Sequence, residues 1–188
     1  MKAVDKEKAG TNISHDEAVH RLWIQSVDLQ QLLGKCIDAV CATVGLSRPQ
    51  FAMLFVLKFS VKPVRIIDLA SNLRQNPNST SMMVDRMVKQ GLVRRVRSTS
   101  DRRAVIIKLT NHGNHVAAQS ITKAWPMIKT LMSTFPDSEI SQFSMILEKF
   151  RQRLCDGLKQ AGDEIQAEGF FKELDSHKIQ KVSTQGSP

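Results

Sequence analysis

The sequence lacks tyrosine, and phenylalanine and tryptophan supply only 5% of its 188 residues. Burial must therefore depend on Leu, Val, Ile, Met and a few Phe side chains. No stretch approaches the roughly 18 consecutive apolar residues that a membrane-spanning helix requires. The opening residues, MKAVDKEKAG, also lack the apolar segment of a signal peptide. We therefore expect a cytoplasmic protein with no membrane partner.

Cysteine is scarce as well. Cys36, Cys41 and Cys155 are odd in number and form no C-x-x-C pair, which argues against a disulfide framework or a structural zinc site and favours a reducing compartment. Cys36 and Cys41 lie five residues apart, about 140° around a helix, so we interpret them as buried thiols without a redox role. His112 and His115 have no third ligand of matching pattern, so no metal site is expected.

Catalytic motifs are also missing from the sequence. We find no Gly-rich phosphate loop, no nucleophile elbow and no pattern of paired carboxylates. We therefore expect no cofactor and no enzymatic activity.

Acidic residues are too few to balance the basic ones, which gives a net charge of +9 and a pI near 9.7. Such a charge indicates a polyanionic partner: nucleic acid, an anionic membrane surface or an acidic protein. A generally basic, solvated surface would give the same bulk charge. The distribution is more informative, because residues 85–108 hold eight basic and two acidic residues, a local charge of +6.

Hydrophobic periodicity predicts a long helix at each end of the chain and a compact middle segment. Ser14 and Glu17 have the spacing of a capping box, and the helix that follows reaches Gly45. At roughly 45 Å, this helix is longer than a small domain needs. We therefore expect part of its apolar face to contact a second chain. After Thr110, two further helices are predicted, as far as residue 160.

The middle segment alternates short helices with strand-like runs. A helix from Ser47 to Phe59 precedes a short strand at Val64-Arg65, a helix over 66–73, a turn, and a helix from about Asn78 to Gln90; strand-like runs follow at 92–97 and 104–109. Helix, turn, helix and β-hairpin is the order of a winged helix-turn-helix. The predicted fold class is therefore mainly α with a small β-wing.

The helix over 78–90 has two different faces. Thr80, Met83, Val84 and Met87 are placed to contact the domain, whereas short polar, basic and apolar side chains occupy the other face together with Asp85. Such a helix suits the DNA major groove, and the hairpin arginines suit phosphates or a narrow minor groove. The alternative interpretation is that the hairpin is simply a solvated, basic β-turn. The candidate DNA contacts are Asn78, Ser79, Ser81, Met82, Arg86, Lys89, Arg97, Ser98, Thr99, Arg102 and Arg103.

Asp101 is an isolated acid between the arginines of the hairpin. A carboxylate in this position would most simply pair with one of the neighbouring arginines. We therefore expect Asp101 to brace the wing.

The same segments carry a family resemblance. The pieces LSRPQ, IIDLASNL, NSTSMMVDRMVKQGLVRR and STSDRRAVIIKLTNHG, from Leu46 to Gly113, resemble the MarR family of winged-helix transcriptional regulators. The combination of GLVRR, DRRA and LT-x-x-G at these separations is specific, and flanking helices extend the resemblance to about residues 14–160. Where many members carry an arginine in the recognition helix, this chain has Met82, so its specificity is not transferable. A base contact by Met82 would be apolar, for example to a thymine methyl.

The resemblance implies a homodimer on a pseudo-palindromic DNA site, with Ser79, Ser81 and Met82 in the major groove and Arg102 or Arg103 in the minor groove. It also implies a division into a flexible N-terminus (1–13), an N-terminal dimerisation helix (14–45), a winged helix-turn-helix domain (46–110), C-terminal dimerisation helices (111–160) and a partly mobile tail (161–188).

Many members of the family respond to a small, often aromatic, ligand held between the dimer helices and the winged domain. The resemblance suggests Trp23, Met53, Trp125 and Met127 as its lining, although Met and Trp at helical spacing also fit an ordinary core.

We therefore predict a sequence-specific, homodimeric transcriptional regulator that acts as a repressor on duplex DNA and is released by an effector. Two alternatives remain open from the sequence. A nonspecific architectural DNA-binding protein would share the charge. A dimeric protein-interaction module with a silent winged domain would share the helices.

Overall fold

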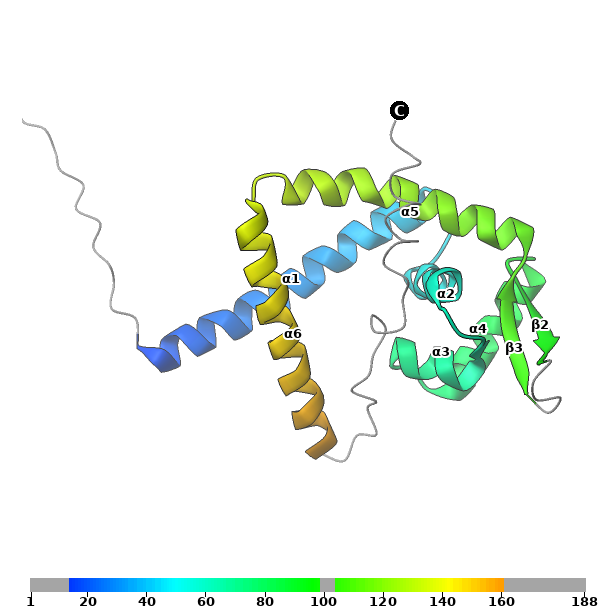
Figure 1. The fold of residues 1–188 in the computed structure, drawn as a ribbon, viewed down its shortest axis with the longest axis horizontal. Helices are drawn as coiled ribbons and strands as arrows, with labels where there is room; N and C mark the ends of the chain where they lie inside the picture. The colour runs from blue at the N-terminus through cyan, green and yellow to red at the C-terminus, as the bar shows by residue number, and fades with distance from the viewer. Residues whose placement is uncertain (1–13, 99–103, 161–188) are drawn as a thin grey trace, which may run out of the picture. The chain divides into compact units, whose positions relative to one another are not determined.

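The computed structural model describes residues 14–98 and 104–160, which form six helices and three strands within those ranges (Figure 1). The order predicted from the sequence is confirmed: a mainly α chain with a small antiparallel sheet. The predicted flexible N-terminus and mobile tail lie outside the described residues. The elements are α1 (His15–Ala42), α2 (Arg48–Phe59), β1 (Val64–Arg65), α3 (Ile66–Leu73), α4 (Pro77–Lys89), β2 (Val93–Arg97), β3 (Val105–Leu109), α5 (Asn111–Met132) and α6 (Asp137–Gln160).

The chain divides into two compact units, Met1–Ile37 and Asp38–Pro188. The first contains most of α1, which begins as predicted: the Glu17 backbone N–H donates to Ser14 Oγ at 3.2 Å. Many apolar side chains of α1 are exposed, which is the property expected of a helix that meets a second chain. They are Val19, Leu22, Trp23, Ile24, Val27, Leu29, Leu32 and Leu33.

In the second unit, α2 to α5 and the three strands surround one hydrophobic core. Leu69 of α3, Val84 and Met87 of α4, and Val93 and Ile107 of the sheet are buried together. Burial of each such side chain stabilises the fold by about 1.5–3 kcal/mol. The apolar spacing of every short helix is therefore explained by one shared core, with α2 adding Met53, Leu54 and Val56 and α5 adding Val116 and Ala117.

The sheet has the strand order β1-β3-β2 and is antiparallel throughout. Ile107 of the central strand pairs with Val64 on one side and Arg95 on the other. Val93, at the start of β2, is buried, whereas Arg94, Arg95 and Arg97, further along the strand, are exposed. In its described part, the wing is held by apolar side chains and presents Arg94, Arg95 and Arg97 to solvent, as predicted.

The helix ends are defined by local hydrogen bonds. At the start of α4, Asn76 Oδ1 accepts from the Asn78 backbone N–H at 2.8 Å, with Pro77 in the first helical position. Gly91 adopts a φ of +68°, which ends α4 and turns the chain into β2. At the start of α5, Thr110 Oγ1 accepts from the Gly113 backbone N–H at 2.9 Å. Helix α4 and the wing are adjacent because the turn between them is so short.

Gly113 provides a test of this packing. A Cβ at Gly113 would lie 1.8 Å from the carbonyl oxygen of Leu92, so Gly113→Ala must displace backbone. We expect it to lower the free energy of unfolding by more than about 2 kcal/mol, measured by urea denaturation. In the control Gly157→Ala, the added Cβ meets nothing within 4 Å, and we expect a gain of about 0.5–1 kcal/mol. Equal midpoints for Gly113→Ala and the parent would contradict the packing described.

Candidate nucleic-acid interface

Helix α4 separates its side chains as the sequence predicts. Thr80, Val84 and Met87 are fully buried, at spacings of four and three residues, and Met83 is half-buried. The opposite side is open to solvent. Asn78, Ser79, Met82, Asp85, Arg86 and Lys89 are exposed there, and Ser81 is half-buried.

Met82 is unusual within this exposed set, because it is a large apolar residue and 59% of its surface is accessible to solvent, although the other side of α4 packs in the core. The helix geometry requires this, since Met82 lies two residues from buried Thr80 and Val84 and therefore projects away from the core. The result is a flexible apolar side chain among short polar ones.

The wing adds positive charge next to α4. Arg94, Arg95 and Arg97 of β2 are exposed. Ser98 is 8% exposed, and its backbone N–H donates to the Ala104 carbonyl at 2.9 Å, which extends the pairing of β2 with β3. The predicted contacts Thr99, Arg102 and Arg103, together with the predicted wing brace Asp101, lie outside the described residues.

An ion pair between α4 and the wing was missed by the sequence reasoning. Arg95 Nη2 lies 2.8 Å from Asp85 Oδ1, and both side chains are largely accessible. Exposed pairs of this kind stabilise a fold by about 0–1 kcal/mol. Two residues ten positions apart carry no pairing signal in the sequence, because their proximity depends on the return of the chain at Gly91. The main consequence of the pair is therefore that it places the Arg95 guanidinium beside α4.

The helix before α4 is fixed by a second carboxylate. Asp68 Oδ2 accepts from the Arg65 backbone N–H at 2.8 Å, and Asp68 Oδ1 accepts from Arg65 Nη2 at 2.9 Å. Burial raises the pKa of the Asp68 carboxyl, but the hydrogen bonds from Arg65 outweigh it and the pKa is lowered. The ionised side chain thus anchors the start of α3 to β1. Arg74, with a φ of +51°, then makes the tight turn into α4.

Comparison with known proteins identifies this arrangement. Residues 46–105 match the sequence profile of the MarR family. The HTH-type transcriptional regulator YsmB of Bacillus subtilis is 30% identical over 110 residues, which cover 58% of this chain and 75% of YsmB. The chain belongs to the MarR family.

Further similarities agree with this assignment. The HTH-type transcriptional repressor YetL of Bacillus subtilis is 25% identical over 150 residues, or 79% of this chain and 89% of YetL. Among solved structures, a MarR mutant from E. coli in complex with operator DNA has a TM-score of 0.62 at 19% identity, covering 73% of this chain and 98% of that one. At this identity the structural match supports the fold alone. The fold class and the family resemblance are therefore confirmed.

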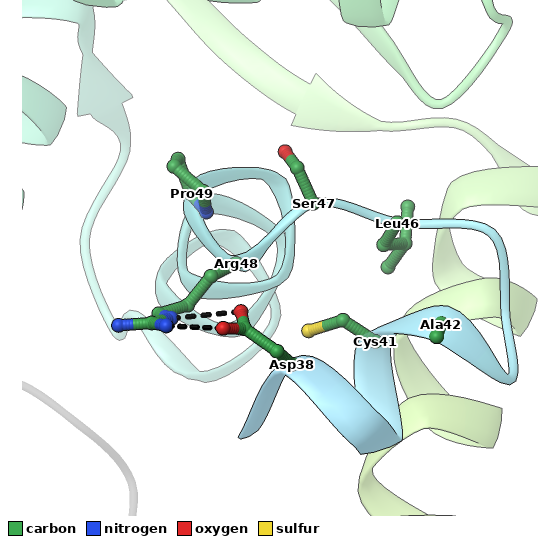
Figure 2. A pocket seen from close by; sticks show the side chains of 7 residues that line it. All are labelled: Asp38, Cys41, Ala42, Leu46, Ser47, Arg48 and Pro49. Carbon is green, nitrogen blue, oxygen red and sulfur yellow. Dashed lines mark hydrogen bonds and ion pairs between the residues drawn. The ribbon is translucent and has the colours of Figure 1, made fainter. Parts of the chain in front are cut away.

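This MarR-family chain also has a pocket where α1 ends and α2 begins (Figure 2), with a volume of about 500 Å³. The Arg48 guanidinium reaches across it to Asp38: Nε donates to Oδ1 at 2.9 Å, and Nη2 donates to Oδ2. These hydrogen bonds lower the pKa of the Asp38 carboxyl. The pocket thus combines one ion pair with a mainly apolar wall. Its lining is Asp38, Cys41, Ala42, Leu46, Ser47, Arg48 and Pro49.

The Cys41 sulfur points toward this pocket but is only 1% exposed as a residue. Burial raises the pKa of the Cys41 thiol, Asp38 raises it further, and Arg48 opposes both. A raised pKa keeps the sulfur in its less nucleophilic thiol form. The prediction of a buried thiol is confirmed for Cys41 and is wrong for Cys36, which is half-buried.

The four residues suggested as an effector lining have different environments, and none of them lines this pocket. Met53 is fully buried in the core of the winged domain. Trp125 and Met127 of α5 are half-buried, and Trp23 of α1 is 57% exposed.

Within residues 14–98 and 104–160, no helix is both long and apolar enough to cross a bilayer. The described His, Cys, Asp and Glu side chains likewise form no group of three or more that would suit a metal ion.

Proposed function

We propose that this chain binds a specific duplex DNA site as a homodimer and represses transcription. The observation that carries the proposal is the surface of α4, where exposed polar and apolar side chains lie beside the exposed arginines of β2. Two similarities support it: the E. coli MarR structure was determined with operator DNA, and YetL is named a repressor.

In this proposal α4 enters the major groove, which is about 12 Å wide and admits one helix. Asn78, Ser79 and Ser81, near the N-terminus of α4, would approach base edges and phosphates. Met82 would make an apolar contact, for which a thymine methyl is the natural partner. Phosphate contacts would come from Arg86, Lys89 and Arg97 and, by resemblance to the family, a minor-groove contact from Arg102 or Arg103.

The homodimer is supported by apolar side chains that the single chain leaves exposed. Leu22, Leu29 and Leu33 share one side of α1, and Phe143, Leu147 and others share one side of α6. Monomeric proteins rarely leave long apolar stripes in water. A dimer would place two copies of α4 about one turn of DNA apart, roughly 34 Å, so that two short contact surfaces read one pseudo-palindrome. The exposed apolar residues of α6 are Ile140, Phe143, Met145, Ile146, Leu147, Leu154 and Leu158.

An effector belongs to the proposal because the pocket beside Arg48 has the size of small-molecule sites, about 300–1,000 Å³. An anionic group would have to displace Asp38 from Arg48, while Leu46 and Pro49 would cover an apolar body. We expect a small aromatic acid to weaken DNA binding by the parent and not by Arg48→Ala. A panel of such acids titrated into the protein–DNA complex tests this, and an unaltered affinity throughout would rule out this use of the pocket.

The DNA contacts are tested by comparing Arg97→Ala with Met82→Ala on labelled duplexes between 50 and 200 mM KCl. Arg97→Ala should weaken binding to all sequences and reduce the slope of log K against log[salt] by about 1, because one phosphate contact is lost. Met82→Ala should leave this slope unchanged and alter the preferred bases.

The outcome separates the proposal from its rivals. A parent without base preference would indicate an architectural DNA-binding protein. A parent that binds no DNA at all would indicate a silent winged domain.

The dimer is tested by Phe143→Glu, which places a charge on the apolar side of α6. We expect the dimer dissociation constant to rise at least about 100-fold, since a buried carboxylate without a partner costs several kcal/mol. Sedimentation equilibrium measures it. Ser144→Glu is the matched control, because Ser144 is the adjacent exposed residue on the same helix and carries no apolar surface. Equal dissociation constants for the two variants would contradict this dimer surface.

A further inference from the structure

The ion pair between Asp85 and Arg95 joins the two parts of the proposed DNA surface. Asp85 projects from α4 three residues after Met82 and four before Lys89, on the side that faces away from the core. Arg95 lies in the middle of β2, and its Nη2 reaches Asp85 Oδ1 at 2.8 Å. The pair therefore fixes the position of a wing guanidinium relative to the recognition helix.

The pair is not required to hold the wing in place. Val93 and Ile107 are buried in the core, and Thr110 and Gly113 hold the base of the hairpin against α5. Asp85 and Arg95 side chains are 54% and 39% exposed, a range in which ion pairs contribute little to stability.

Asp85 is a negatively charged residue on a positively charged surface. In the described parts of residues 85–108, Asp85 is the one acidic side chain, alongside Arg86, Lys89, Arg94, Arg95, Arg97 and Lys108. A carboxylate on a surface that meets phosphates reduces affinity for every DNA sequence. The carboxylate can still improve discrimination between DNA sequences. Specificity is the difference between the affinities for the preferred and the other sequences, so weaker binding to the other sequences raises it.

We propose that Asp85 is a specificity-determining positioning residue. By holding the Arg95 guanidinium against α4, Asp85 withholds one arginine from phosphate binding that does not depend on DNA sequence. The inference rests on the proposed function, since it assigns a role within the same DNA surface. It differs from the expected bracing by Asp101, because the carboxylate lies on the recognition helix and not at the tip of the hairpin.

The test is Asp85→Asn, assayed on the preferred duplex and on mixed-sequence DNA over a range of salt. Releasing Arg95 should add one phosphate contact. Mixed-sequence DNA should then bind about fivefold tighter, and the magnitude of its salt slope should rise by about 0.9. Affinity for the preferred duplex should not rise, so discrimination falls about fivefold. Asp85→Glu should restore the parental values.

The double variant Asp85→Asn with Arg95→Gln shows whether Asp85 acts through Arg95. If it does, the double variant returns the mixed-sequence salt slope to the parental value. If Asp85 acts only by its own charge, the tighter nonspecific binding persists and the proposal is overturned. Glu17→Gln is the matched control, because it makes the same change of charge in an exposed ion pair of α1, with Arg21 at 3.3 Å, and should leave discrimination unchanged.

Two further outcomes separate this inference from the proposed function. A parent that discriminates between sequences, with Asp85→Asn discriminating equally well, overturns the role of Asp85 alone. A parent that binds no DNA overturns both.

Discussion

The contact on which the arrangement of α4 and the wing depends is the close approach of the first turn of α5 to the backbone of Leu92. The Thr110 backbone N–H donates to the Leu92 carbonyl at 3.1 Å, and the Thr110 hydroxyl donates to the Gly91 carbonyl at 2.5 Å, with the Leu92 oxygen also within reach at 3.2 Å. Gly113 has no side chain where a Cβ would overlap that oxygen. Because Leu92 lies between the end of α4 and the start of β2, this junction fixes α4, the wing and α5 relative to one another.

Strand β2 combines a buried apolar residue with exposed positive charge. Val93 is buried while its neighbours on the strand are exposed, so one short segment supplies both an anchor for the core and positive charge for the surface. The burial holds the segment in place, and the exposed arginines contribute almost nothing to folding. We therefore expect substitutions at these arginines to leave the fold intact.

Much of the fold was predictable from local patterns. The order of the elements, the buried side of α4 and the Thr110 cap each depend on residues within four positions of one another. The Asp85–Arg95 pair and the Asp38–Arg48 pair were not predictable, since ten residues and a chain reversal separate each pair. Cys36 was predicted to be buried because helical spacing indicates which residues share a side of a helix, but not which side is covered. The individual DNA contacts remain predictions, because they depend on a partner that the chain does not contain.

The most direct test of the central claim is selection of bound duplexes from a random DNA pool at about 150 mM salt, which screens weak nonspecific contacts. A homodimer that reads DNA through two copies of α4 should enrich a pseudo-palindrome whose half-sites lie about one helical turn apart. Retention of duplexes that share no motif would contradict sequence-specific regulation by this surface.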